Sequence, residues 1–229
     1  MKFEESIRLK VVLVSCENKI GLVNNLNNDG NEIAELPSDG LLGFMSRINP
    51  NVIFISSGGT YRLLKKANLN VISISKYTKH PEMRDGLVTS IDHKVHGGIM
   101  AQPFYNEDNL YIKNYGMLNV DAVITNFSPL KLEKVLTVNE FEGLRNRIDI
   151  GGPLMCMTAR KAFINTLLLT NPSDYLDVIK ELNGNDGLVS LGLRTRLLKE
   201  ANKMLFEYNQ SIDKFYENID VNILVNSYK

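Results

Sequence analysis

The 229-residue sequence has little cysteine, little histidine and no tryptophan. Its two cysteines, Cys16 and Cys156, are far apart, and its three histidines (His80, His93 and His96) form no H-x-x-x-H pattern. Structural zinc sites need closely spaced thiolate and imidazole ligands, so the sequence predicts no metal site. Two free thiols are the simpler interpretation of the cysteines, and one disulfide is the alternative.

The sequence also lacks an excess of charge of either sign and a long hydrophobic run. It has 26 Lys and Arg against 26 Asp and Glu, so no overall field would draw the chain to nucleic acid or to a membrane surface. No apolar run approaches the roughly 18 residues that span a bilayer, and the first residues, MKFEESIRLK, are too charged for a signal peptide. We therefore expect a cytoplasmic protein with no nucleic-acid partner and no membrane partner.

What the sequence does contain is typical of a globular α/β protein, with 44% hydrophobic and 23% charged residues. Short β-branched runs alternate with helical segments in the first half of the chain. We expect strands over residues 10–15, 51–57, 71–74 and 120–125, and helices over residues 41–48 and 61–67. This alternation favours a mainly parallel sheet with helices on both faces.

The second half of the sequence is dominated by helical patterns. We expect helices over residues 153–169, 172–182 and 191–208, and a tail from residue 212 that is helical and then extended. Residues 24–40 are rich in Asn, Asp and Gly and indicate a loop, and residues 75–103 lack clear periodicity. The predicted organisation is an α/β domain over residues 1–152, with residues 153–229 as a helical part of the same unit.

A glycine-rich segment between a predicted strand and a predicted helix has the features of a phosphate cradle. Ser57, Gly58, Gly59 and Thr60 begin the helix, where free backbone amides and the helix dipole favour an anion. The glycines let a ligand approach the backbone closely, and the two hydroxyls could add donors. Lys19, after the first strand, could supply a countercharge. A plain strand-to-helix turn with a solvated lysine explains the same residues equally well.

Four segments, in order, resemble one known family. They are residues 10–23 (KVVLVSCENKIGLV), residues 56–64 (SSGGTYRLL), the PEM and KVHGGI elements within residues 81–99, and residues 148–153 (IDIGGP). The sequence resembles the IMP cyclohydrolase domain of the bifunctional purine-biosynthesis enzyme (AICAR transformylase/IMP cyclohydrolase), as a stand-alone, diverged homologue. The clearest departure in length is an insertion near residues 28–50.

The resemblance implies a fold, a reaction and a ligand. The fold is a methylglyoxal-synthase-like three-layer α/β sandwich with a mainly parallel sheet and a C-terminal helical lobe, in a protein that forms a homodimer. The reaction is the dehydrative ring closure of a formylated imidazole carboxamide ribonucleotide, without a metal or an organic cofactor. The partner that the resemblance implies is therefore a phosphorylated imidazole or purine ribonucleotide.

The resemblance also implies which residues form the site. Asp149 and Lys161 match catalytic positions of the family. Eleven further residues match or replace substrate-binding positions: Lys19, Ser57, Gly58, Gly59, Thr60, Thr89, Ser90, Asn126, Ser128, Ile150 and Gly151. Read from the residues alone, Asp149 could instead cap the following helix, and Lys161 could be an ordinary solvated lysine.

Three replacements separate the sequence from the family pattern. Leu87 and Thr89 stand where the family has an arginine and a lysine, and Ser128 stands where it has a tyrosine. Charge-assisted donors of this kind contribute strongly to catalysis, and His93 or Lys94 are candidates to replace them. The alternative hypothesis is a homologue without normal cyclohydrolase activity, either a nucleotide-binding regulatory protein or a related cyclase in a specialised pathway.

Overall fold

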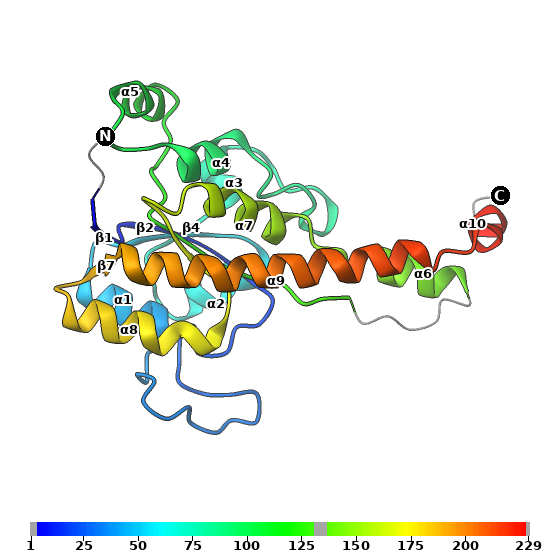
Figure 1. Ribbon diagram of the computed structural model, residues 1–229, viewed down its shortest axis with the longest axis horizontal. Coiled ribbons are helices and arrows are strands. Elements are labelled where there is room, and N and C mark those ends of the chain that lie inside the picture. The colour runs from blue at the N-terminus through cyan, green and yellow to red at the C-terminus, as the bar shows by residue number, and fades with distance from the viewer. Residues whose placement is uncertain (1–3, 131–136, 228–229) are drawn as a thin grey trace.

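A five-stranded parallel sheet forms the centre of the molecule in the computed structural model, which describes residues 4–130 and 137–227 (Figure 1). The strand order is β4-β3-β2-β5-β6, and every neighbouring pair is parallel. The strands are β2 (Val11–Cys16), β3 (Ile53–Ser56), β4 (Val71–Ser73), β5 (Ala122–Asn126) and β6 (Leu167–Leu169). The predicted α/β class with a mainly parallel sheet is confirmed.

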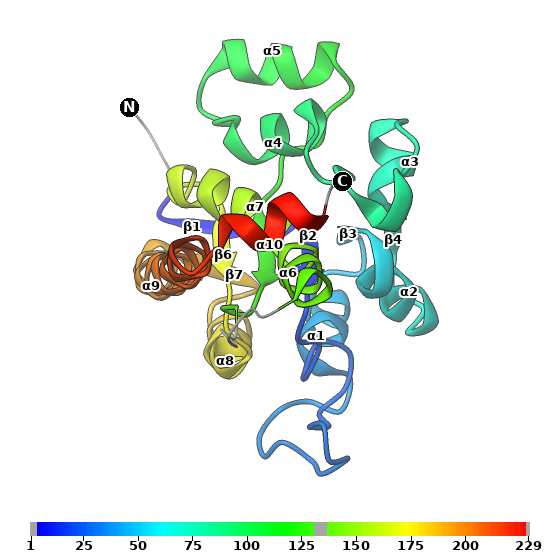
Figure 2. The ribbon, with the colours of Figure 1, turned by 90° about the vertical axis from the view of Figure 1, so that its right-hand side faces the viewer.

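Helices cover both faces of this sheet. The helices are α1 (Gly40–Ile48), α2 (Gly58–Lys66), α3 (Ile74–Thr78), α4 (His93–Met100), α5 (Asn106–Asn114), α6 (Val138–Arg145), α7 (Gly151–Lys161), α8 (Tyr175–Gly184), α9 (Leu191–Glu217) and α10 (Val221–Ser227). Figure 2 shows α1 and α8 on the side of the sheet opposite to α4 and α7. Two further short strands, β1 (Ser6–Arg8) and β7 (Leu188–Ser190), pair antiparallel beside this sandwich.

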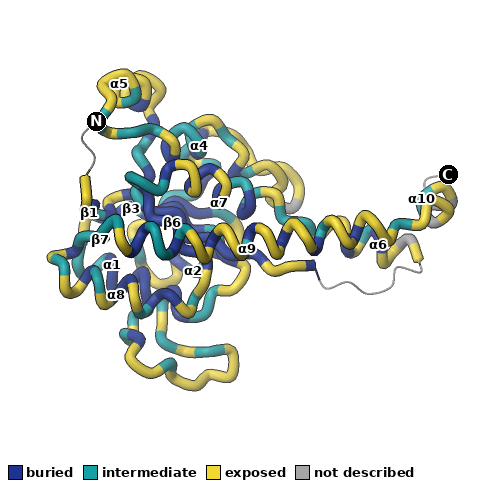
Figure 3. Tube along the Cα trace, in the orientation of Figure 1, coloured by how far each residue is buried: buried dark blue, intermediate teal, exposed yellow. Residues whose placement is uncertain are grey.

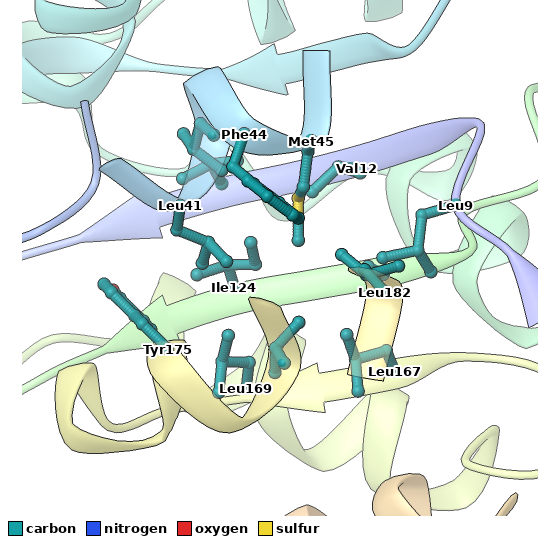
Figure 4. Packing of buried hydrophobic residues seen from close by; sticks show 14 of the residues in the cluster. Leu9, Val12, Leu41, Phe44, Met45, Ile124, Leu167, Leu169, Tyr175 and Leu182 are labelled. Atoms are coloured by element: carbon teal, nitrogen blue, oxygen red, sulfur yellow. The ribbon is translucent and has the colours of Figure 1, made fainter. Parts of the chain in front are cut away.

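The apolar residues of the central strand explain why the sheet is buried on both faces. Along β2, Val12 and Val14 belong to one core cluster, whereas Val11 and Leu13 belong to the other. Successive side chains of a strand point to opposite faces, so a continuous apolar run supplies two cores. Figure 4 shows the first cluster, in which sheet residues pack against α1 and α8. The second cluster contains residues of α4, α7 and α9.

The structure corrects several predicted elements. Residues 75–103, which lack clear periodicity in the sequence, contain most of α3, a 3₁₀ turn (Arg84–Gly86) and α4. The predicted helix over residues 153–169 is wrong in its second half, since α7 ends at Lys161 and β6 follows as an edge strand beside β5. The tail from residue 212 begins as a helix, as predicted, because α9 continues to Glu217. The extended end predicted after it is wrong as far as residue 227, because α10 follows, and residues 228–229 lie outside the described residues. Residues beyond 152 therefore contribute a strand to the same sheet.

Two parts of the chain project from the sandwich. The polar segment 24–40 forms the loop at the bottom of Figure 1, and most of its residues are exposed (Figure 3). At the other projection, the C-terminal end of α9 lies with α6 and α10 (Figure 1). A separate small core holds these helices together, built from Leu130, Phe141, Leu144 and Phe215.

The two cysteines are buried inside the sandwich. Cys16 and Cys156 are both buried and free, and burial raises the pKa of each thiol to about 12. Reactive cysteines are exposed and have lowered pKa values, so these two are packing residues. Within the described ranges, no helix is both long and apolar enough to cross a membrane.

Candidate functional site

The carboxyl ends of the central strands define the candidate site. From β2 the chain first builds β3 and β4 on one side, and later β5 and β6 on the other. Such a reversal of strand order opens a crevice beyond the carboxyl ends of the strands, where α/β proteins bind ligands. Lys19, Ser57 and Asn126 lie at or just beyond the carboxyl ends of β2, β3 and β5.

The glycine-rich segment forms the first turn of α2 with an open side. Ser57 precedes the helix in an extended conformation and forms no capping hydrogen bond, and Gly58 has φ +53°. A side chain added at Gly58 would meet nothing within 4 Å. At Gly59 the nearest atoms would be the side chains of Lys19 and Arg62, 3.7 and 3.8 Å away. The turn therefore offers free amides between two cations, which suits a phosphate.

The Thr60 hydroxyl has a structural role. It accepts a hydrogen bond from the Cys16 backbone amide (3.3 Å) and donates to the Cys16 carbonyl (3.1 Å). The side chain is buried, so it joins the start of α2 to the end of β2. The suggestion that this hydroxyl adds a donor for an anion does not fit these contacts, and only the Thr60 backbone amide remains for that purpose.

The Asn126 side chain holds the loop that carries Lys19. Its Nδ2 donates to the Asn18 carbonyl (2.9 Å), and its Oδ1 accepts from the Asn18 amide (2.7 Å). Both ends of the side-chain amide are thus used on the backbone next to Lys19. In this structure Asn126 therefore contributes to the site by holding the loop that carries Lys19 in place.

Asp149 is fixed at the first turn of α7. Its Oδ1 accepts a hydrogen bond from the Gly152 amide at 3.1 Å. The Tyr208 hydroxyl on α9 accepts from the Asp149 amide (2.7 Å) and donates to the Asp149 carbonyl (2.9 Å). The predicted capping role and a role in a site are therefore compatible, because only Oδ1 is used on the helix.

The surroundings of Asp149 favour its protonated form. Burial raises the pKa of this carboxyl, and the negative charge of Glu17 raises the pKa further, whereas hydrogen bonds from Gly152 and Gly151 lower it. The net direction is upward. An upward shift of the pKa makes a carboxyl a better proton acceptor, which favours a role in general acid–base catalysis.

Several polar atoms converge on the start of α7. A Cβ built at Gly152 would lie 2.5 Å from Asp149 Oδ2 and 3.2 Å from Thr125 Oγ1. A Cβ at Gly151 would lie 2.5 Å from Ser90 Oγ. Only glycine fits where these side chains approach the backbone so closely. Among the described residues, the buried Thr125 hydroxyl has no hydrogen-bond partner.

Two adjoining cavities lie beside Asp149. The first, of about 530 Å³, is lined by Glu17, Phe127, Ser128, Pro129, Leu130, Arg147 and Asp149. The second, of about 660 Å³, shares Glu17 and Ser128 with the first and also contains Lys19 and residues of the polar loop that begins at residue 24. The Ser128 amide donates to Glu17 Oε2 (2.8 Å) where the cavities meet. Together they form one cleft that extends from Asp149 to Lys19.

Two charged residues of this cleft were not predicted from the sequence. Glu17 immediately follows β2, and Arg147 lies two residues before Asp149. Their closeness to Lys19 and Asp149 in the sequence was a signal that could have identified them. In the part of the chain that the structure describes, no group of three or more His, Cys, Asp or Glu side chains could hold a metal ion.

Lys161 lies at the opposite end of α7 from Asp149. It follows Gly151 by ten residues, which is a rise of about 15 Å along a helix. Lys161 lines a separate cavity of about 330 Å³ with Gly97, Asp108 and Tyr111. The cavity that Lys161 lines is therefore different from the cavity that Asp149 lines.

Of the predicted substrate-binding residues Thr89 and Ser90, only Ser90 lies next to the start of α7. Ser90 reaches Gly151, but the Thr89 hydroxyl donates to the Gly86 carbonyl (2.7 Å). Ile150 is 58% exposed at the start of α7, and Leu87 is 51% exposed.

The two candidate replacement cations are engaged elsewhere. His93 Nε2 lies 2.8 Å from the Tyr111 hydroxyl, and Lys94 Nζ lies 5.9 Å from the centre of the Tyr77 ring. His96, on the same helix, places Nδ1 2.8 Å from Thr158 Oγ1 of α7, and burial lowers its pKa. His96 therefore joins α4 to α7 as a neutral side chain.

Comparison with known proteins gives one family and one group of relatives. Residues 46–154 match the model of the MGS-like domain. The bifunctional purine biosynthesis protein PurH of Fusobacterium nucleatum is 35% identical over 192 residues, which is 83% of this chain and 38% of that protein. PurH of Magnetococcus marinus is 31% identical over 74% of this chain and 32% of that protein. The chain thus spans about a third of the length of these relatives.

A solved structure has a similar fold over nearly the whole chain. The crystal structure of ForH matches with a TM-score of 0.72 and 25% sequence identity. The match covers 91% of this chain and 98% of the ForH chain. The sandwich and its helical extension are therefore one architecture that also occurs as a chain of similar extent.

Proposed function

Because this chain contains an MGS-like domain and is homologous to PurH over most of its length, we propose that it is an IMP cyclohydrolase-like enzyme. Its substrate would be a formylated imidazole carboxamide ribonucleotide or a close analogue. One observation carries the proposal. The Asp149 carboxyl, whose pKa is raised by burial, lines a cavity that adjoins a second cavity lined by Lys19. The Lys19 side chain in turn lies 3.7 Å from a Cβ built at Gly59, at the start of α2.

The cleft fits a monophosphate ribonucleotide. The phosphate would bind the amides at the start of α2 between Lys19 and Arg62, where the helix dipole adds to the two positive charges. The imidazole would lie at the start of α7, near Asp149 and Ser90. Holding the formyl group and the carboxamide in the reactive rotamer is itself a large part of the catalysis of such an intramolecular reaction.

The reaction needs proton transfers that Asp149 could perform. The carboxamide nitrogen attacks the formyl carbon, a C–N bond forms, and the formyl oxygen takes up a proton as the nitrogen loses one. The resulting hydroxyl then leaves with a proton from a ring nitrogen as water. A carboxyl with a raised pKa can accept the first proton and return it to the departing oxygen. No redox step is involved, and the atoms balance as ribonucleotide to inosinate plus water.

A second candidate function is nucleotide binding without this turnover, or a related ring closure in a specialised pathway. Leu87, Thr89 and Ser128 favour it, because none of them supplies the charge or the reach of the side chain that the family pattern has. The Glu17 carboxylate in the cleft also favours it. In either case we propose a homodimer.

The deciding experiment is an absorbance assay of inosinate formation from the formylated aminoimidazole-carboxamide ribotide, with calorimetric titration of inosinate in parallel. Turnover above the uncatalysed rate supports the cyclohydrolase proposal. Binding of inosinate without turnover supports the second candidate. Neither turnover nor binding contradicts both. The Lys19→Gln variant is the matched control, because the phosphate contact proposed for this lysine predicts weaker inosinate binding in the variant.

A further inference from the structure

Arg147 is a cation of the cleft that neither the sequence motifs nor the family pattern identified. It lies two residues before Asp149 and lines the same cavity of about 530 Å³. Its backbone amide donates to the Leu144 carbonyl, which fixes the chain at this point. Across residues 4–130 and 137–227, its guanidinium forms no hydrogen bond or ion pair with another residue. An exposed guanidinium without a protein partner is available to a ligand.

The other two ionisable side chains of this cavity, Glu17 and Asp149, are both carboxyl groups. Glu17 Oε2 accepts a hydrogen bond from the Ser128 amide, and Asp149 Oδ1 accepts from the Gly152 amide. Without a cation, a polarised oxygen of a bound substrate would meet only carboxylates here. Arginine stays protonated at all physiological pH values and presents several donors in a fixed fork. Arg147 is thus the group in the cavity that can stabilise negative charge on oxygen.

The position of Arg147 separates it from the phosphate end of the cleft. The start of α2 already has two cations, Lys19 and Arg62, whose side-chain atoms lie within 4 Å of a Cβ built at Gly59. Lys19 lines the second cavity, which Arg147 does not. Arg147 lies at the Asp149 end, where the proposed function places the reacting base.

We infer that Arg147 is a catalytic residue that binds the formyl oxygen of the substrate and stabilises the negative charge that develops there during ring closure. The inference rests on the proposed function. Preorganised donors aimed at a developing oxyanion are a main source of catalysis in acyl-type reactions. Arg147 would supply the positive charge that Leu87 and Thr89 do not.

The test compares Arg147→Gln, Arg147→Lys and the control Arg160→Gln. The Arg160 side chain bonds Asn202 on α9, away from the cleft. We expect Arg147→Gln to lower kcat by about 10²–10³, the size seen when one oxyanion donor is removed, while the Kd for inosinate changes less than about threefold. Arg147→Lys should recover part of the rate, and Arg160→Gln should resemble the wild type. Circular dichroism of each variant checks that it is folded.

Each other outcome overturns the assignment. A folded Arg147→Gln variant with wild-type kcat excludes a catalytic role. A variant with unchanged kcat and a raised KM shows that Arg147 binds substrate and transition state equally. A wild-type protein without turnover overturns the proposed function and this assignment together. An active wild type with an equally active Arg147→Gln variant overturns the assignment alone, so the two failures are distinguishable.

Discussion

The two ends of helix α7 carry the two residues that resemble catalytic positions, and they differ in almost every physical respect. At the N-terminal end, Asp149 is partly buried, bonded to the Gly152 amide and close to Ser90 and Thr125. At the C-terminal end, Lys161 is exposed in a smaller cavity. The helix holds the two ends about 15 Å apart.

The helix dipole alone explains the lysine at the C-terminal end of α7, but it does not explain the features of the N-terminal end. A carboxylate at a helix N-terminus and a lysine at its C-terminus are both favourable, by a few tenths of a kcal/mol to about 1 kcal/mol each. That suffices to explain Lys161. It does not explain why Asp149 is kept where burial raises its pKa, or why Gly151 and Gly152 leave room for three polar side chains. The N-terminal end of α7 therefore has features that helix stability does not require.

The largest expected effect separates the two ends by activity. Asp149→Asn should lower kcat by about 10²–10⁴, because an amide cannot transfer the proton that the reaction requires. Lys161→Gln should leave kcat within about threefold of the wild type, since Lys161 lines a different cavity from Asp149. Steady-state kinetics on both folded variants checks this. Equal losses would show that Lys161 enters the site by another route, for example from a second copy of the chain.

A smaller effect concerns the packing at the N-terminal end. Gly152→Ala would place a methyl group 2.5 Å from Asp149 Oδ2 and 3.0 Å from the Phe127 ring. We expect a loss of about 1–3 kcal/mol in the free energy of unfolding, the usual cost of overpacking. Gly184→Ala, at the end of α8, is the matched control because its methyl group would meet nothing within 4 Å. Urea unfolding of both variants measures the difference, and equal stabilities would contradict the crowding.

The smallest effect is a pH dependence of stability. Because burial raises the folded-state pKa of Asp149 above the ordinary value of about 3.9, the folded protein binds this proton more tightly than the unfolded chain does. The stability contributed by this group is complete below about pH 4 and is lost as pH rises through the folded pKa. We therefore expect the wild-type free energy of unfolding, relative to Asp149→Asn, to fall with rising pH.

The measurement is chemical unfolding of both proteins at a series of pH values, with Lys161→Gln as a third protein. Lys161→Gln should keep the wild-type trend, because the trend originates at the other end of α7. A wild-type stability that rises with pH relative to Asp149→Asn would mean that hydrogen bonds and positive charge outweigh burial at Asp149.

Most of the parallel sheet was predictable because its strands are continuous apolar runs. The expectations for residues 10–15, 51–57, 71–74 and 120–125 match β2 to β5 within a few residues. The strand β6 was not predictable from its pattern, because an apolar run after a helix fits either structure. Its position beside β5 decides the outcome. The KVHGGI segment likewise forms α4, where Val95 and Ile99 pack into the second core.

The candidate site also has a part that was predictable from the sequence and a part that was not. The turn at residues 57–60 was identified from its residue types and its place between a strand and a helix, whereas Asp149 was identified from the resemblance of its segment to the family. The use of Thr60 and Asn126 on backbone groups, and the cavity shared by Glu17 and Arg147, depend on segments far apart in the sequence. No local pattern contains that information.

The sequence by itself determined the α/β class, the parallel core and the segments that approach the carboxyl edge of the sheet, because apolar periodicity and glycine placement are local properties. Only the tertiary structure decided that Asp149 and Lys161 lie at opposite ends of one helix. It also decided that Glu17 and Arg147 join Asp149, and that His93 and Lys94 face other partners. The physical reason is that burial, charge environment and cavity walls arise from which elements pack together, and packing is a property of the whole chain.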